Sequence, residues 1–302
     1  MGRCIKVRTP ATTANLGPGF DSFGLALDLW NEVMFYQDNS DDLVTIEGEG
    51  SDTLPRDSTN LIYQSAMRYA EMNHLQLPGD LRIFCKNEIP VGSGLGSSSS
   101  AIVAGLLGAK AIINSNASVH SLLQLANDIE GHGDNVAACL LGGMIITAQS
   151  DHQFLFSKVH TKDFKIIIAL PQIELSTKDA RDLLPEYVSM SDAVFNISRA
   201  SILVNLLING DWEKLNDVMQ DRLHQPFRLS LIPGAQEALK VAHQYGAKSA
   251  VLSGAGPSIL AIALDHEVEI GNAMMEAFSD AGVSSRIIST KVSGIGAYYK
   301  KC

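Results

Sequence analysis

The sequence has few cysteines, and none of them forms a close pair. The four are Cys4, Cys85, Cys139 and Cys302. Their wide spacing fits neither a C-x-x-C zinc site nor a small disulfide framework. We therefore expect buried or idle thiols in a reducing compartment, with Cys302 exposed at the chain end and open to oxidation.

A secretion signal and long apolar runs are also missing. Residues 1–20 contain no sustained apolar stretch of the kind that directs secretion. Runs such as Ala101–Leu107 and Lys165–Leu170 are far shorter than the roughly 20 residues that span a bilayer. We expect a soluble, cytoplasmic protein without a membrane partner.

Positive charge is scarce, with 23 Lys and Arg against 33 Asp and Glu and a net charge of −10. A nucleic-acid partner would need a basic face that displaces counterions, so the composition argues against one. It does not exclude a nucleotide, because a local set of amide N–H groups can bind a polyphosphate on an acidic protein. The 302 residues, 46% of them apolar and 19% charged, suffice for two domains with sizeable cores.

Hydrophobic periodicity predicts strands with interposed helices in both halves of the chain. Predicted helices cover residues 61–72, 98–113, 118–131, 191–209, 211–219 and 234–245. Predicted strands cover residues 5–7, 25–36, 43–47, 81–86, 142–147, 166–170, 249–252, 259–264, 286–291 and 296–300. This pattern indicates an α+β fold with a boundary between Ser150 and Lys165, which gives domains 1–157 and 158–302.

A segment rich in glycine and serine joins the strand that ends near residue 86 to the helix that begins near Ser98. Three glycines in five residues let the backbone bend and approach a ligand closely, because no Cβ stands in the way. The loop amides and the N-terminus of the following helix together form an anion site. The residues predicted to bind nucleotide phosphates are Pro90, Val91, Gly92, Ser93, Gly94, Leu95, Gly96, Ser97, Ser98, Ser99 and Ser100.

This segment matches neither a flexible linker nor the commoner nucleotide-binding loops. A linker would not be flanked by a strand and a strongly periodic helix. The Gly-Lys-Ser/Thr of a Walker A loop occurs nowhere in the sequence. The glycine spacing differs from the dinucleotide fingerprint, and the protein-kinase motifs are absent.

The pattern P-x-x-x-G-L-G-S-S before a helix resembles the second motif of the GHMP small-molecule kinases. Residues 14–21, Ala-Asn-Leu-Gly-Pro-Gly-Phe-Asp, resemble the first motif, and residues 253–258, Ser-Gly-Ala-Gly-Pro-Ser, resemble the third. The resemblance implies a two-domain α+β GHMP kinase fold. Its N-terminal domain is like domain 2 of ribosomal protein S5, its C-terminal domain is ferredoxin-like, and ATP lies between them. The resemblance also implies that Gly254 and Gly256 support the phosphate loop and that Asn60 contacts the base, although Asn60 fits a helix cap nearly as well.

Within the family, the first motif is similar to the version found in members that phosphorylate the side-chain hydroxyl of L-homoserine. The Gly-Glu-His signature of the galactose and mevalonate enzymes is missing. Segments 130–137 and 176–181 resemble the same members, with Gly133 and Thr13 as small departures from the commoner proline and serine. The substrate residues that this resemblance implies are Asn15, Asp21, His132, Asn135, Thr177, Arg181 and Arg228.

The chemistry of a zwitterionic amino acid agrees with this set, because a carboxylate suits arginine and an ammonium group suits a carboxylate. Taken one at a time, the residues have ordinary alternatives. Asp21 fits an Asx turn, and Arg181 fits a charged helix start. Arg228 could be a solvated surface arginine, and His132 could be the partner of a helix C-terminus.

The resemblance further implies that Ser98 and Glu130 bind Mg²⁺, which takes only one or two protein oxygens when phosphates and water supply the rest. The catalytic residues it implies are Ser98, Glu130, Asp134 and Asn135. Asp134 matches the aspartate that mevalonate kinase uses as a base, whereas Asn135 would orient the hydroxyl if no base is used.

Two other functions stay open at this point. The chain could be a GHMP kinase that acts on a different small alcohol, or a non-catalytic nucleotide-binding protein of the same fold. Relatives are often dimers, so the resemblance also allows a homodimer.

Overall fold

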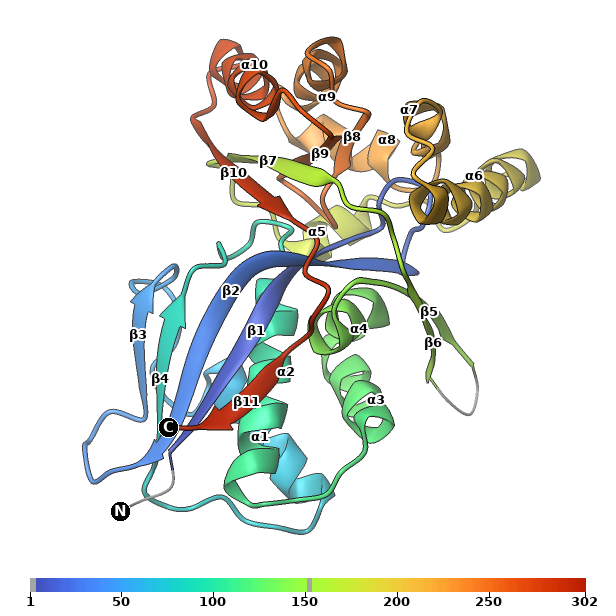
Figure 1. Ribbon diagram of the computed structural model, residues 1–302. Helices are drawn as coiled ribbons and strands as arrows, with labels where there is room; N and C mark the ends of the chain where they lie inside the picture. The colour runs from blue at the N-terminus through green and yellow to red at the C-terminus, as the bar shows by residue number, and fades with distance from the viewer. Residues whose placement is uncertain (1–3, 151–153) are drawn as a thin grey trace.

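The computed structural model describes residues 4–150 and 154–302 and arranges them around two sheets (Figure 1). In the first sheet β11, β1, β2, β4 and β3 lie side by side, and β5 pairs with both β2 and β6. The strands of the second sheet follow the order β10, β7, β9, β8. The long strands β1 and β2 are antiparallel from Ile5 to Ala14, with a bulge between Pro10 and Ala11.

The elements alternate along the chain as an α+β protein requires. The first sheet consists of β1 (Ile5–Ala14), β2 (Phe23–Gln37), β3 (Val44–Gly48), β4 (Leu81–Asn87), β5 (Met144–Gln149), β6 (Phe154–Val159) and β11 (Tyr298–Lys301). Its helices are α1 (Leu61–Met72), α2 (Ser97–Ile112), α3 (Val119–Glu130) and α4 (Gly133–Leu141).

The second sheet consists of β7 (Lys165–Pro171), β8 (Ser249–Leu252), β9 (Ile259–Ala263) and β10 (Ser285–Lys291). The helices of this half are α5 (Thr177–Asp182), α6 (Met190–Asn209), α7 (Leu215–Val218), α8 (Gln225–Arg228), α9 (Ala235–Gln244) and α10 (Glu267–Asp280), with a short 3₁₀ helix at Leu229–Leu231.

Helix α2 is the central helix of the first half and carries the glycine-rich loop at its N-terminus. Most of its residues are buried, because it packs against both α1 and β1. Two glycines allow this close packing: a Cβ at Gly105 would lie 2.3 Å from the carbonyl oxygen of Ile62, and one at Gly108 would lie 2.2 Å from the Phe35 ring. The close packing fixes the position of the loop that precedes the helix.

The two halves share a hydrophobic core. One cluster of buried side chains combines Leu25 and Leu95 from the first half with Ile166, Ile168 and Leu260 from the second. Because these side chains pack directly against one another, the space between the halves has rigid walls.

Most elements agree with the sequence prediction. The helix at 61–72 is confirmed, and α3 has Ser118 as its N-cap and a left-handed Gly131 at its C-terminal end. Helices α4, α5, α8 and α10 and strand β6 were not predicted, and the helix predicted at 211–219 is reduced to Leu215–Val218. The last strand leaves the second half and pairs with β1 in the first sheet. The boundary at 157/158 stays a prediction; β6, which belongs to the first sheet, runs to Val159.

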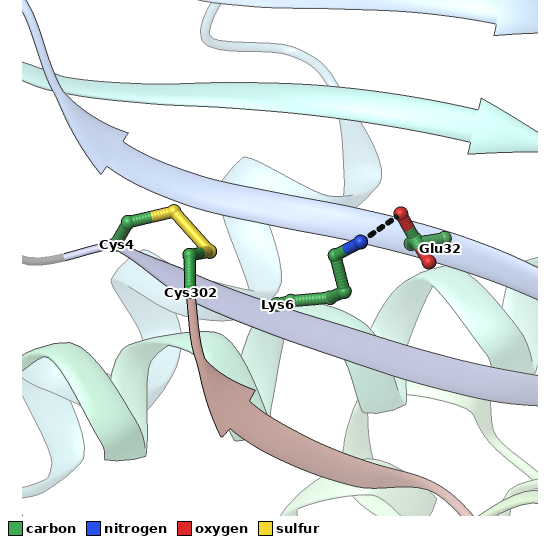
Figure 2. The surroundings of a disulfide bond; sticks show 4 residues. All are labelled: Cys4, Lys6, Glu32 and Cys302. Carbon is green, nitrogen blue, oxygen red and sulfur yellow. Dashed lines mark ion pairs between the residues drawn. A yellow bond between two sulfur atoms is a disulfide. The ribbon is translucent and has the colours of Figure 1, made fainter.

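The expectation that Cys4 and Cys302 are idle thiols is wrong in this structure, where the two form a disulfide (Figure 2). The residues are 298 positions apart, so spacing could not indicate the pair. Pairing of β11 with β1 brings their Cα atoms to 5.3 Å, within the normal range for a disulfide. Cys85 and Cys139 are buried free thiols, as expected.

Helix α6 is, by length and composition, apolar enough to cross a membrane, and only 22% of the relevant window is buried. The sequence analysis did not single out this run. A single helix of this kind also occurs in water-soluble proteins, so by itself it is weak grounds for a membrane span.

Candidate active site

A cavity of about 340 Å³ lies between the two halves of the chain. Residues from all three glycine-containing motifs line it, together with residues of α3, α4 and α5. The cavity brings together every residue predicted for the site except Pro90, Leu95 and Ser99. Leu95 is fully buried in the shared core instead, and Ser99 is fully buried with its hydroxyl bonded to Glu130.

The glycine-rich loop has the geometry that a phosphate cradle needs. Gly92, Gly94 and Gly96 all have positive φ, between 63° and 76°. A Cβ at Gly96 would lie 1.9 Å from Thr12 Oγ1, and one at Gly94 would lie 2.3 Å from the carbonyl oxygen of Ser253. Only glycine fits these two positions, and Gly96 leads directly into the N-terminus of α2.

The third motif supports the loop from the other half of the chain. Ser253 Oγ donates to the carbonyl oxygen of Gly94 at 2.7 Å and also bonds to the Thr13 hydroxyl. Ser258 Oγ donates to the carbonyl oxygen of Ser93, also at 2.7 Å. These bonds tie the loop to the third motif and restrain its backbone.

Ser98 and Glu130 lie together at the first turn of α2. The carboxylate oxygen Oε1 of Glu130 accepts hydrogen bonds from Ser98 Oγ at 2.6 Å and from Ser99 Oγ at 2.8 Å. Within residues 4–150 and 154–302, His, Cys, Asp and Glu side chains nowhere gather in threes as a metal cage would require. A carboxylate beside a hydroxyl is instead the sparse oxygen set that suits Mg²⁺.

The first motif forms a tight turn between β1 and β2. Asn15, Leu16 and Asp21 all have positive φ, and Asn15 is buried. The Asn15 side chain holds the turn closed: its Nδ2 donates to the carbonyl oxygen of Gly254 at 2.9 Å, and its Oδ1 accepts from the Asp21 amide at 3.0 Å. Asn15 thereby fixes the carboxylate of Asp21 at the cavity wall.

Asp21 and Arg181 form a two-pronged ion pair inside the cavity. Arg181 Nη1 and Nη2 donate to the two carboxylate oxygens of Asp21 at 2.8 Å each. Hydrogen bonding to Asp21 raises the pKa of Arg181 further. Arg181 lies on α5, whose N-cap Ser176 accepts from the amide of Asp179 at 3.0 Å. Thr177, the first residue of α5, also lines the cavity.

Arg228 is buried, so the alternative of a solvated surface arginine is wrong. Its exposed fraction is 2%, and its guanidinium contacts neutral hydrogen-bond acceptors: the carbonyl oxygens of Ala180 and Gly254 and the ring of His224. Among the described residues, no carboxylate forms an ion pair with it within 4.0 Å. Burial therefore lowers its pKa, with the nearby Arg181 adding to the effect. A buried, unpaired cation at a cavity wall is a binding group for an anion.

His132, Asp134 and Asn135 form a network at the start of α4. Asp134 is buried, and its Oδ1 lies 3.3 Å from His132 Nδ1 and accepts from the Asn135 amide at 2.7 Å. The close contact with the Asp134 carboxylate raises the pKa of His132. Asn135 Oδ1 accepts from Thr12 Oγ1 at 2.8 Å.

Some site residues were missed by the sequence analysis, and one has a second role. Thr12 holds Asn135, and its amide donates to the Leu95 carbonyl oxygen, yet a threonine inside a strand gives no sequence signal. Asn60 lines the cavity and also caps α1, accepting from the Ile62 amide at 3.0 Å. Asn31 was missed as well: its Oδ1 accepts from the amides of Glu88 and Ile89 and so holds the start of the loop.

Comparison with known proteins identifies similar sequences and structures. Residues 60–143 match the family model of the GHMP kinases N-terminal domain, and residues 203–281 match that of the GHMP kinases C-terminal domain. The chain is 40% identical to homoserine kinase of Moorella thermoacetica over 93% of its own length and 95% of the relative's. It is also 40% identical to homoserine kinase of Desulfitobacterium hafniense, with 97% and 99% covered.

A solved structure is similar over the whole chain. The crystal structure of homoserine kinase from Cytophaga hutchinsonii superposes with a TM-score of 0.88 at 32% identity, covering 99% of this chain and 98% of that one. L. major mevalonate kinase superposes with a TM-score of 0.69 at 16% identity, which shows a shared fold. The predicted two-domain α+β architecture is thereby confirmed.

Proposed function

The chain belongs to the homoserine kinases of the GHMP kinase family, and from this membership we propose how its cavity works. The protein is an ATP-dependent small-molecule kinase that transfers the γ-phosphoryl group of ATP to the side-chain hydroxyl of L-homoserine. The product, O-phospho-L-homoserine, belongs to threonine biosynthesis. Which residues carry out each part of the reaction is the substance of the proposal.

One observation carries the assignment of roles: a main-chain phosphate cradle and a buried unpaired arginine open into the same cavity. Arg228 and Arg181 bind the substrate carboxylate, and Asp21 binds its ammonium group. His132, Asn135 and Thr177 complete this part of the pocket. Asn15 acts on the substrate through Asp21, because both ends of its amide are bonded to the protein.

ATP binds with its phosphates on the amides of the glycine-rich loop and the N-terminus of α2. Its base lies at the apolar end of the cavity, which Leu54, Leu61, Ile62 and Val91 line beside Asn60. Ser98 and Glu130 hold Mg²⁺, which neutralises charge on the phosphates when bound. The hard oxygen donors of Ser98 and Glu130 and their direct contact at 2.6 Å fit that ion.

Positioning and charge neutralisation supply most of the catalysis in phosphoryl transfer. Asn135 orients the substrate hydroxyl, and Asp134 holds Asn135 and His132 in place. Because Asp134 is buried, accepts from Asn135 and contacts His132, we assign it this holding role, and the proton leaves the hydroxyl with or after the phosphoryl group.

The experiment is an ADP-release assay with ATP, Mg²⁺ and a panel of alcohols. We expect turnover on L-homoserine. Turnover on mevalonate or galactose, and none on homoserine, would assign the chain to another GHMP kinase. ATP binding without turnover on any alcohol would favour the non-catalytic alternative, which the intact Ser98–Glu130 pair argues against.

We further propose a cytoplasmic homodimer without nucleic-acid or membrane partners. The net charge of −10 opposes nucleic-acid binding. The exposed side chains Met190, Val194 and Ile197 on α6 supply an apolar face for a second copy. Light scattering of the purified protein and of Ile197→Asp tests this, and recovery of the protein in the membrane fraction would contradict it.

A further inference from the structure

His224 lies beneath the substrate pocket and contacts Arg228 without lining the cavity. Its side chain is fully buried between the first-motif turn and the guanidinium of Arg228. The ring stacks on Phe20, with centroids 5.2 Å apart and planes 21° apart. Nothing in the proposed reaction uses this imidazole directly.

The two hydrogen-bond partners of the His224 ring select one tautomer of the imidazole. Nε2 lies 2.9 Å from the carbonyl oxygen of Gly17, which can only accept, so Nε2 carries the proton. Nδ1 lies 3.4 Å from Arg228 Nη1, which can only donate, so Nδ1 presents its lone pair. One neutral tautomer satisfies both contacts. Burial favours the same neutral form, since it lowers the pKa of His224.

The backbone at His224 is held by the buried carboxylate of Asp221. Asp221 accepts from the amides of His224 and Gln225 at 3.0 and 2.7 Å, and from Asn196 Nδ2 at 2.7 Å. Asn196 Nδ2 also contacts the carbonyl oxygen of Pro18 at 3.2 Å. These bonds tie the segment before α8 to the first-motif turn, so the imidazole has a fixed place.

A neutral acceptor has a specific advantage beside Arg228. A carboxylate in this position would neutralise the guanidinium and compete with the substrate carboxylate. The imidazole Nδ1 and the carbonyl oxygens of Ala180 and Gly254 orient the group and leave its positive charge unpaired. Phe20 adds a ring face to the same guanidinium at 5.3 Å.

We propose that His224 is a positioning residue for substrate specificity: its Nδ1 lone pair aims the guanidinium of Arg228 at the carboxylate of the amino-acid substrate. This inference rests on the proposed function and extends it to a residue outside the pocket wall. It makes homoserine recognition, rather than nucleotide binding or phosphoryl transfer, depend on His224.

Two conservative variants separate the contacts. In His224→Asn an amide oxygen takes the place of Nδ1 and keeps an acceptor for Arg228. In His224→Gln the amide reaches the place of Nε2, which keeps the bond to Gly17 and removes that acceptor. We expect His224→Gln to raise the KM for homoserine about tenfold, equivalent to about 1.4 kcal/mol. His224→Asn should stay within about twofold of the wild type, and kcat and the KM for ATP should change little in both.

A substrate without the carboxylate distinguishes a positioning role of His224 from a merely structural one. The effect of His224→Gln on kcat/KM should vanish with 3-aminopropan-1-ol, which has the hydroxyl and the amine but no carboxylate. Equal losses with both substrates, equal effects of the two variants, or an unchanged KM for homoserine in a folded His224→Gln enzyme would overturn the proposal.

A measurement on the wild type applies even if both variants fail to fold. The ¹⁵N shifts of the His224 ring should show a proton on Nε2 and a Nδ1 signal that moves when homoserine binds. A proton on Nδ1, or no change on binding, would overturn the proposal. A wild type without homoserine turnover would instead overturn the proposed function, so the two failures are distinguishable.

Discussion

Arg181 and Asp21 bind each other across the cavity, with both N–O distances at 2.8 Å, although the residues are 160 positions apart in the sequence. We have assigned them to opposite ends of the substrate, Arg181 to its carboxylate and Asp21 to its ammonium group. In this structure each is the counter-ion of the other. A zwitterion that enters between them replaces one ion pair with two, whereas a substrate with a single charge leaves one partner unpaired.

Replacing Arg181 by Gln should raise the KM for homoserine roughly 10- to 100-fold, because a charge-assisted hydrogen bond contributes about 1.5–3 kcal/mol. The KM for ATP should change little. The preference of the enzyme for homoserine over 3-aminopropan-1-ol should shrink by the same factor, because Arg181 acts on the carboxylate. Steady-state kinetics with both substrates measures this.

The control for Arg181 is Arg222→Gln. Arg222 also pairs with an aspartate, Asp192, at 3.3 Å, but it lies outside the cavity. This variant should keep the wild-type KM for both substrates. An Arg181→Gln enzyme with an unchanged KM for homoserine would remove Arg181 from the pocket.

Glu130→Gln should lower kcat about 10²- to 10³-fold, because an amide binds a divalent cation more weakly and positions it poorly. The affinity for homoserine should persist, because Glu130 forms its described hydrogen bonds with Ser98 and Ser99. The measurements are kcat as a function of Mg²⁺ concentration and homoserine binding by calorimetry. Glu237→Gln, an exposed carboxylate paired with Lys240, is the matched control. A Glu130→Gln enzyme with wild-type kcat and Mg²⁺ dependence would contradict the metal assignment.

The sequence predicted local features far better than long-range contacts. The helix at 61–72 and the capped helix from Ser118 to Gly131 follow from periodicity and capping residues that lie within one turn of each other. The glycine-rich loop was recognisable for the same reason. By contrast, the Cys4–Cys302 pair and the Asp21–Arg181 pair depend on which strands and helices become neighbours, and spacing does not encode that.

Burial is the second property that the sequence did not reveal. Arg228 looked equally like a surface residue, and only its packing against Phe20 of the first-motif turn and Ala180 of α5 makes it a buried cation. Helix α10 was missed, although its buried residues Ile270, Met274 and Phe278 show a helical spacing. Thr12 was missed because its role depends on a contact with Asn135, which is 123 positions away.

Gly94→Ala should weaken ATP binding, in addition to the stability that it loses through the left-handed backbone conformation. Its φ is +76°, and a Cβ would meet the backbone oxygen of Ser253 at 2.3 Å, so the loop must move away from the third motif. Gly282→Ala is the matched control, because its φ is also +76° but nothing lies within 4 Å of the added atom. Both variants should lose about 1–2 kcal/mol of stability through the left-handed conformation. Only Gly94→Ala should raise the KM for ATP, by about tenfold or more; equal values in the two variants would contradict the cradle.

The His132–Asp134 pair should contribute stability that depends on pH. The close contact with the Asp134 carboxylate raises the pKa of His132 above its ordinary value of 6.5. A group whose pKa is raised on folding stabilises the protein fully below its unfolded pKa, and the contribution disappears as the pH rises through the folded pKa.

Denaturant unfolding of the wild type and of His132→Gln tests this at about pH 5.5 and about pH 9. The variant should be less stable by up to about 1 kcal/mol at the lower pH, and the difference should shrink at the higher pH. His160→Gln, at an exposed position, is the control and should show no such trend. A difference that grows with pH would contradict the ion pair.

The disulfide between Cys4 and Cys302 should make stability depend on the redox state. It closes a loop of nearly the whole chain and restricts the unfolded state, which typically contributes about 2–4 kcal/mol. Oxidised protein should therefore unfold at higher denaturant concentration than protein kept in reductant. Cys302→Ser should behave like the reduced protein under both conditions.

Thiol titration checks the pairing independently. Burial raises the pKa of Cys85 to about 12 and raises that of Cys139 as well, so neither should react in the native state. The native oxidised protein should show no reactive thiol, and reduction should release two, those of Cys4 and Cys302, which flank the first and last strands. Two reactive thiols in protein purified without reductant, together with a denaturant unfolding midpoint that is the same with and without reductant, would mean that the pair does not form in solution. The pairing of β11 with β1 would then rest on its backbone hydrogen bonds alone.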